Sequence, residues 1–141
     1  MDRPRRAPPR APIVPDRVRR IDGGFAFVPN RFLHDGFFAQ LTHLERALYL
    51  FLVLAADRDG VSFYAYDRIC AALGATLDDY LAARNALVDL DLVAFDGTRF
   101  QVLALPPRPS RRARPLRTED DFERDDPATI RQIIRDSLPR R

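Results

Sequence analysis

The region between residues 60 and 105 constrains the fold most, because short segments with different signatures follow one another there in a fixed order. A short apolar run at 61–64 predicts a strand. Helical patterns follow at 67–73 and 77–90, and two further apolar runs near the end of the region predict a hairpin. This order indicates an α+β domain that is mainly helical.

The junctions between these segments carry specific turn chemistry. Gly74 is expected to close the first helix, because glycine readily adopts the left-handed conformation found at helix ends. Thr76 is the expected N-cap of the second helix, with Asp79 three residues later, as in a capping box. Asp96-Gly97 lies between two apolar runs and predicts a two-residue hairpin turn in which both residues have positive φ. Together these signals predict a winged helix-turn-helix with the hairpin as its wing.

The second of these helices has a predicted core face. Its apolar residues recur at three- and four-residue intervals, as on one buried face of a helix: Leu77, Tyr80, Leu81, Leu87, Val88 and Leu90. Its solvent side is then formed by Asp78, Asp79, Ala82, Asn85 and Asp89, with Arg84 near the edge. In the hairpin, the residues expected to pack back onto the domain are Phe95, Phe100 and Val102.

The residues before this region add a central helix. Thr42 followed by Glu45 fits a capping box and predicts a helix that runs to about Asp57. Apolar residues cover nearly every face of this helix, which is typical of a buried helix. Upstream of it, residues 24–28 form a candidate short strand, and 30–38 is a candidate short helix capped by its first residue.

The chain of 141 residues is long enough for one modest domain with tails. No apolar run reaches the ~20 residues that cross a bilayer, and the arginine-rich start lacks the apolar core of a signal peptide, so we expect a cytoplasmic protein. The single cysteine, Cys70, excludes an internal disulfide and a multi-cysteine zinc site. No ligand cluster surrounds the two histidines and no glycine-rich phosphate loop is present, so we expect no metal, no cofactor and no enzymatic activity.

The charges divide the chain into segments of opposite sign. Residues 1–20 carry seven arginines against two aspartates and form a predicted disordered arm. Residues 21–105, the predicted winged helix-turn-helix domain, carry six arginines against eleven acids. Residues 106–126 form a charged linker that is basic first and then acidic. Residues 127–141 form a predicted short amphipathic helix and tail.

Three stretches carry a family resemblance: Ala55-Ala56-Asp57-Arg58-Asp59-Gly60, then Asp67-Arg68-Ile69 with Leu73-Gly74, and Leu87-Val88-Asp89-Leu90-Asp91-Leu92-Val93. Over roughly residues 41–105, the chain resembles the bacterial winged helix-turn-helix domains of plasmid and phage replication initiators and of related mobile-element proteins. The resemblance implies DNA binding in replication, transcription or mobile-element control. Two positions depart from the pattern: the glycine before the wing is Asp91 here, and the recognition helix begins with Asp78 and Asp79 in place of Ser, Thr, Arg or Lys.

The second helix is the candidate reader of bases. In helix-turn-helix proteins the exposed residues near the start of this helix meet base edges in the major groove. Here these residues are Asp78, Asp79, Ala82 and Asn85, with Arg84 beside them. Asn85 can bind adenine through two hydrogen bonds, and an aspartate can accept from cytosine N4. In the alternative interpretation, the two aspartates only stabilise the helix dipole, by ~0.3–1 kcal/mol each.

The arginine-rich segments are the candidate phosphate contacts. Proline keeps both segments extended, and arginine binds phosphate through two parallel hydrogen bonds. The residues concerned are Arg17, Arg19 and Arg20 before the domain, Arg99 in the wing, and Arg108, Arg111, Arg112 and Arg114 after the domain. Such arms hold DNA by counterion release or enter a minor groove. The alternative is a solvated linker without a ligand.

The C-terminal segment is the candidate partner-binding element. Its apolar residues share one helical face: Ile130, Ile133, Ile134 and Leu138. Because so short a helix is unstable alone in water, it is expected to dock onto its own domain, a second copy or another protein. The acidic charge of the domain supports a second hypothesis, in which the chain is a winged-helix adaptor that binds proteins.

Overall fold

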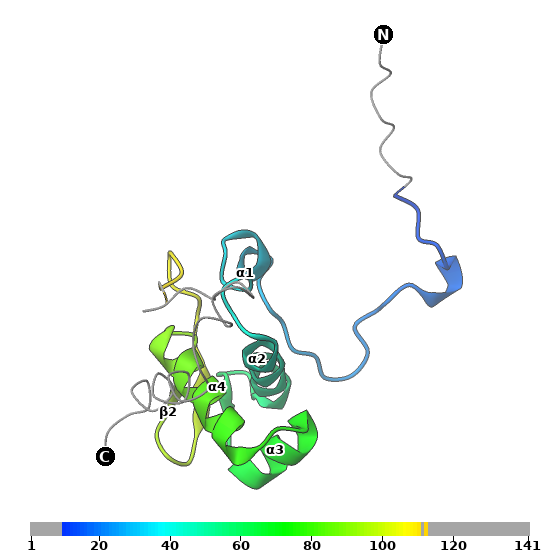
Figure 1. Ribbon diagram of the computed structural model, residues 1–141. Coiled ribbons are helices and arrows are strands. Elements are labelled where there is room, and N and C mark those ends of the chain that lie inside the picture. Colours follow the sequence, from blue (N-terminus) through cyan, green and yellow to red (C-terminus); the bar gives the residue numbers. More distant parts are fainter. Residues whose placement is uncertain (1–9, 111, 113–141) are drawn as a thin grey trace, which may run out of the picture.

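The computed structural model describes residues 10–110 and 112. Within them the fold is α+β and mainly helical, with a small antiparallel sheet, as the sequence predicts (Figure 1). The elements in chain order are the 3-10 turn η1 (Pro15–Arg17), α1 (Arg31–His34), α2 (His43–Ala55), β1 (Val61–Ser62), α3 (Tyr66–Leu73), α4 (Leu77–Asp89), β2 (Val93–Phe95) and β3 (Phe100–Val102). No helix among these residues has the length and apolar character needed to cross a membrane.

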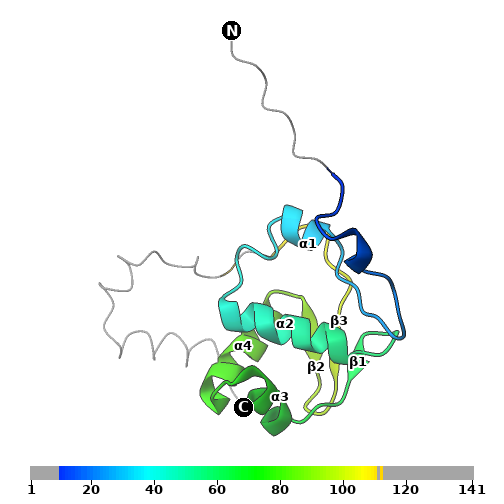
Figure 2. The ribbon, with the colours of Figure 1, turned by 90° about the vertical axis from the view of Figure 1, so that its right-hand side faces the viewer.

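Helix α2 begins with the predicted capping box. The Thr42 hydroxyl accepts a hydrogen bond from the Glu45 backbone N–H at 3.2 Å, and the Glu45 carboxylate accepts one from the Thr42 N–H at 3.1 Å. The inner face of α2 is fully buried and packs against α3, α4 and the sheet. The predicted all-round burial is wrong, because α3, α4 and the sheet cover only part of the circumference of α2 (Figure 2), and Leu50 and Leu54 are exposed.

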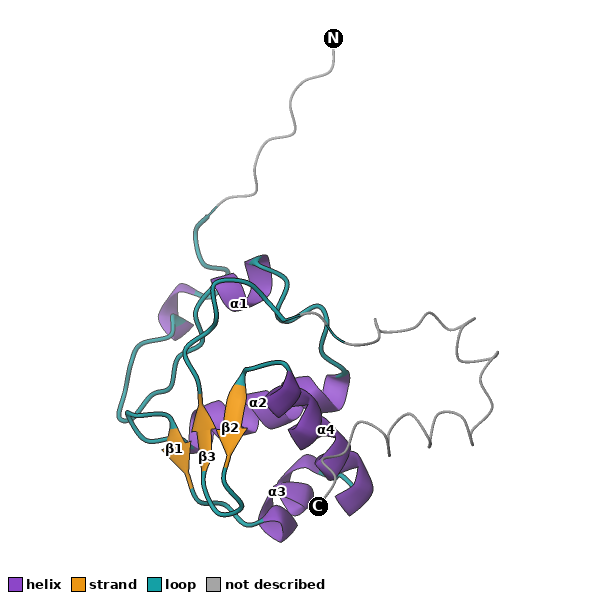
Figure 3. Cartoon of the chain, turned by 90° about the vertical axis from the view of Figure 1, so that its left-hand side faces the viewer, coloured by secondary structure: helices purple, strands orange, loops and turns teal. Residues whose placement is uncertain are grey.

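The sheet has the order β1-β3-β2, with β3 in the middle (Figure 3). Gly60, just before β1, approaches β3 very closely: the Val102 N–H donates to the Gly60 carbonyl at 2.8 Å. Gly60 also has a φ of 87°, and a Cβ on it would lie 2.6 Å from the Val102 carbonyl oxygen. The position therefore requires glycine, both for its backbone conformation and for the space that it leaves.

The ends of α3 and α4 follow the predicted chemistry. Gly74 ends α3 in the left-handed conformation, with φ 63°. The Thr76 hydroxyl caps α4 by accepting from the Asp79 N–H at 3.1 Å, which is one of the two contacts of the predicted capping box; the return contact from the Thr76 N–H to the Asp79 carboxylate is absent among the described residues. After α4, Asp91 also takes a left-handed conformation, with φ 62°, while the Leu92 N–H donates to the Leu87 carbonyl. This is a Schellman-type helix end, in which glycine is the usual residue.

The hairpin turn differs from the prediction by one residue. Strands β2 and β3 pair as far as Phe95 and Phe100, and the Asp96 N–H donates to the Arg99 carbonyl at 3.2 Å. The two turn residues are therefore Gly97 and Thr98, and of the Asp-Gly pair only the glycine has positive φ. The Asp96 carboxylate moves the turn because it accepts the backbone N–H groups of Thr98 and Arg99 at 3.0 and 2.6 Å.

The chain before α2 contains less regular structure than predicted. Residues 24–28 form no strand, because residues 18–28 make no backbone hydrogen bonds with the other described residues. Helix α1 ends at His34, because Gly36 has a φ of 92° and turns the chain back. That reversal buries Phe37, whose ring lies near Phe32 in the core. The predicted disordered arm contains one 3-10 turn, η1, within its described residues.

Candidate nucleic-acid interface

Helix α4 presents an acidic and apolar outer surface. Asp78, Asp79 and Asp89 are exposed, whereas Ala82 is half-buried. Leu77 and Val88 are exposed too, so their predicted places in the core are wrong. Asp78 and Asp79 lie in the first turn, where each carboxylate stabilises the helix dipole by ~0.3–1 kcal/mol. Facing a DNA backbone, the same carboxylates would repel phosphates.

The only cationic residue of α4, Arg84, is held between the helix and the hairpin. Its guanidinium carbon lies 4.7 Å from the ring centre of Phe95 and 5.9 Å from that of Tyr80. Burial raises the pKa of Tyr80, and the Arg84 charge acts in the opposite direction. Arg84 makes no ion pair with a described carboxylate, so its charge remains available at the edge of α4.

Asn85 is buried, with 5% of its surface exposed, so the prediction that it faces solvent is wrong. Its Oδ1 accepts hydrogen bonds from Arg84 Nε at 3.3 Å and Nη2 at 3.2 Å. The amide oxygen is therefore already used, and a two-bond contact with adenine would have to break these bonds. Its Nδ2 has no hydrogen-bond partner among the described residues.

At the tip of the hairpin, the charge of Arg99 is already paired. Its Nε lies 2.9 Å from the Asp96 carboxylate. Hydrogen bonds from the Arg99 and Thr98 backbones, and then from the Arg99 side chain, lower the pKa of Asp96 from its usual 3.8 to about 2. Arg99 can reach a phosphate only in competition with this neighbouring carboxylate.

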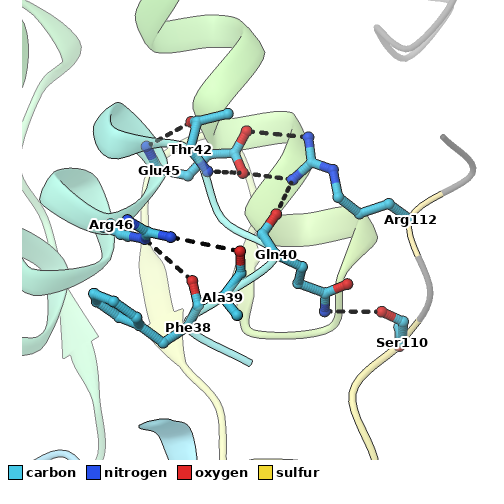
Figure 4. Close-up of polar contacts among 8 residues, drawn as sticks. All are labelled: Phe38, Ala39, Gln40, Thr42, Glu45, Arg46, Ser110 and Arg112. Atoms are coloured by element: carbon cyan, nitrogen blue, oxygen red, sulfur yellow. Dashed lines mark hydrogen bonds and ion pairs between the residues drawn. The ribbon is translucent and has the colours of Figure 1, made fainter. Parts of the chain in front are cut away.

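The arginine-rich segment after the domain is fixed to the domain by Arg112 (Figure 4). Arg112 Nη1 lies 2.5 Å from Glu45 Oε1, Nη2 lies 3.3 Å from Oε2, and Nη1 also donates to the Gln40 carbonyl at 3.2 Å. The Gln40 side chain in turn donates to the Ser110 carbonyl at 3.0 Å. The guanidinium of Arg112 is therefore bound to a buried carboxylate, and it could reach a phosphate only by breaking this ion pair. Its DNA contact stays a prediction.

Two arginines inside the domain are also engaged with backbone oxygens. Arg31 donates to the carbonyls of Leu105 and Pro106 at 2.6 and 2.9 Å. Arg46 donates to the Phe38 carbonyl at 3.1 Å and lies over the Phe38 ring (Figure 4). These arginines stabilise the fold and have little capacity left for a ligand.

The described arginines of the N-terminal segment make no such contacts with the other described residues. Arg10, Arg17, Arg19 and Arg20 are all exposed, and none makes an ion pair with a described carboxylate. Arg108 is exposed as well. Arg111, Arg114 and the candidate partner-binding residues Ile130, Ile133, Ile134 and Leu138 lie outside the described residues.

Sequence reasoning missed two further exposed arginines, Arg58 and Arg68. Arg68 lies in the first half of α3 and at the edge of an open depression of about 650 Å³, together with Phe63 and Tyr64. They were overlooked because residues 21–105 carry a net negative charge. Their positions would have pointed to them, since Arg58 precedes β1 and Arg68 lies in the first half of α3.

No protein-family model, no curated protein and no solved structure matches this chain.

Proposed function

We propose that this chain is a non-enzymatic DNA-binding protein with a winged helix-turn-helix domain that acts in replication, transcription or mobile-element control. In this assignment α3 and α4 are the helix-turn-helix and the β2–β3 hairpin is the wing. The observation that carries the proposal is a set of three exposed arginines directly before a domain with this order of elements: Arg17, Arg19 and Arg20, none of which makes an ion pair with a described carboxylate. The resemblance described above favours the same role.

The charges of the described residues favour a particular mode of binding. Because the outer surface of α4 is acidic and Asn85 is buried, we expect this helix to make only weak contacts with bases. The N-terminal arginines instead offer phosphate contacts, which release counterions and carry no sequence information. Arg68 is placed to add one more phosphate contact, since the first helix of a helix-turn-helix crosses the DNA backbone. We therefore expect affinity to come mainly from the arm.

The test is a salt titration of the full chain with random duplex DNA. Replacing Arg17, Arg19 and Arg20 together by alanine should reduce the slope of log K against log salt by about 2.7, since each phosphate contact contributes about 0.9. Arg108→Ala, which removes one exposed arginine beyond the domain, is the matched control and should change the slope by less than 1. Absence of binding by the natural chain at low salt would overturn the proposal.

The exposed carboxylates of α4 favour a second candidate, a winged-helix adaptor that binds a basic surface of another protein. The double substitution Asp78→Asn and Asp79→Asn separates the two candidates. If α4 lies near DNA, removing both charges should strengthen binding in the same titration, because a repulsion is lost. If α4 binds a protein partner and does not approach DNA, the titration should not change.

A further inference from the structure

The segment between η1 and α1 carries several large apolar side chains that are exposed to solvent. Ile21, Phe25 and Phe27 are 74%, 69% and 76% exposed, and Figure 1 shows this segment standing away from the helices. The backbone of residues 18–28 also makes no hydrogen bonds with the other described residues. Soluble monomers rarely leave such an apolar surface uncovered, and when they do it usually marks an interaction site.

A second uncovered apolar surface lies on the outer side of α2. Leu50 and Leu54 are 53% and 66% exposed, whereas the buried residues of α2 belong to the face that packs against α3, α4 and the sheet. At the end of α2 lies the depression of about 650 Å³, whose lining includes Ala55, the last residue of α2, with Phe63 and Tyr64. Phe63 is itself 66% exposed. We call these residues the α2 face.

We propose that two copies of this chain form a dimer by reciprocal exchange, in which residues 21–28 of each copy pack against the α2 face of the other. Phe25 and Phe27 are two residues apart, so in an extended chain they point to the same side, about 7 Å from each other. In the proposed dimer, Phe25 and Phe27 of each copy enter the depression of the other copy, which is lined by Phe63 and Tyr64. The arrangement is isologous and therefore closes at two copies.

The areas available match those of a stable dimer. At about 200 Å² for a fully buried aromatic side chain, the exposed parts of Phe25, Phe27, Phe63 and Tyr64 supply roughly 500 Å² per copy. The exposed aliphatic residues of both surfaces, Ile21, Leu50 and Leu54, bring this toward about 800 Å² per copy, the size of a standard interface.

The dimer does not rest on DNA binding, and its test contains no DNA. Analytical ultracentrifugation of the full chain at micromolar concentrations should show a dimer. Phe25→Ser with Phe27→Ser changes the exchanged segment, residues 21–28. Leu50→Gln with Leu54→Gln changes the α2 face without introducing a poor helix former. Each pair should weaken dimerisation by about 100-fold or more, because apolar anchors at the centre of an interface are lost. Leu77→Gln with Val88→Gln, on the outer surface of α4, is the matched control and should leave the dimer intact.

Mixing the two variants distinguishes exchange from other dimers. A heterodimer of the Phe25/Phe27 variant and the Leu50/Leu54 variant retains one of the two contacts, because the natural residues 21–28 of one copy meet the natural α2 face of the other. The mixture should therefore form heterodimers, while neither variant dimerises alone. A monomeric natural chain would overturn the proposal, and would indicate that residues 21–28 or the C-terminal segment cover the α2 face of their own copy. A dimer that survives the Phe25 and Phe27 substitutions would overturn it too. Circular dichroism of each variant confirms that the fold is retained.

Discussion

The two arginine-rich segments on either side of the domain have similar compositions but different surroundings. In the N-terminal segment, Arg17, Arg19 and Arg20 are exposed and bind no described carboxylate. In the C-terminal segment, Arg112 bridges both oxygens of Glu45 and a backbone carbonyl, so that the chain is fixed at the start of α2. The same residue type therefore stabilises the fold in one segment, whereas in the other it binds no carboxylate within the described part of the chain.

The difference arises from the partner. Glu45 is drawn into the domain by its role in the capping box, and its side chain is only 6% exposed. A buried carboxylate needs a cation and further hydrogen bonds to offset its lost hydration, and Arg112 is the residue that supplies them. No comparable carboxylate faces the N-terminal segment among the described residues. The function of an arginine here is thus decided by what it faces rather than by the composition of its segment.

The largest expected effect is that of Arg112→Ala. The substitution leaves the buried Glu45 carboxylate with the Thr42 N–H as its one remaining partner among the described residues. Its expected cost is about 2–3 kcal/mol in the free energy of unfolding, somewhat below that of breaking a fully buried pair, because Arg112 is partly exposed. Denaturant unfolding measures this cost. The matched control Arg108→Ala, in the same segment, should stay within about 0.5 kcal/mol, and equal costs for the two would contradict the comparison.

Glu45→Gln is expected to have a smaller effect, because it separates the cap from the ion pair. Glutamine at this position of a capping box still accepts the Thr42 N–H, but it carries no charge for Arg112. We expect a loss of about 1–2 kcal/mol in the same unfolding experiment. Combining Glu45→Gln with Arg112→Ala should cost less than the two single losses added together, because both remove the same interaction. Simple additivity would show that the two residues act independently.

Replacing Arg17, Arg19 and Arg20 by alanine should have almost no effect on stability. These side chains touch nothing in the described structure that unfolding would expose, so we expect a change within about 0.5 kcal/mol. The same variant should show the reduced salt slope predicted for DNA binding, whereas Arg112→Ala should keep most of the slope. Thermal unfolding of each variant, measured together with its salt titration, compares the effects on stability and on DNA binding. A variant that loses both stability and binding would show that the N-terminal segment also packs on the domain.

The parts of the fold that the sequence predicted well are those with local causes. Gly74, Thr76 and the Thr42–Glu45 capping box each act within a few residues, and each lies where it was predicted. Helices α2, α3 and α4 therefore begin and end within two residues of their predicted bounds. The family assignment and the DNA-binding role have no such local test and stay predictions.

The parts that failed depend on neighbours distant in sequence. The exposure of Leu50 depends on which side of α2 is covered by α3, α4 and the sheet, and periodicity on an all-apolar helix does not reveal that side. The burial of Asn85 accompanies the folding of the Arg84 side chain over it toward Phe95. The docking of Arg112 requires Glu45, 67 residues away in the chain. In the candidate site, the exposure of the described arm arginines and of Asp78, Asp79 and Asp89 was therefore predictable from sequence, whereas the burial of Asn85 was not.

The smallest expected effect concerns the hairpin turn. Its ion pair between Arg99 and Asp96 is exposed, in contrast to the buried pair of Arg112 and Glu45. Asp96 has a pKa of about 2 in the folded chain, below its usual 3.8, chiefly because it accepts the Arg99 and Thr98 backbone N–H groups. Its contribution to stability is therefore complete above about pH 4 and is lost as the pH falls toward 2. An NMR titration of the Asp96 carboxyl measures the shift directly. Arg99→Ala should raise this pKa only in part, since the backbone donors remain. Full return to 3.8 would show that the side-chain pair, and not the turn, holds the charge.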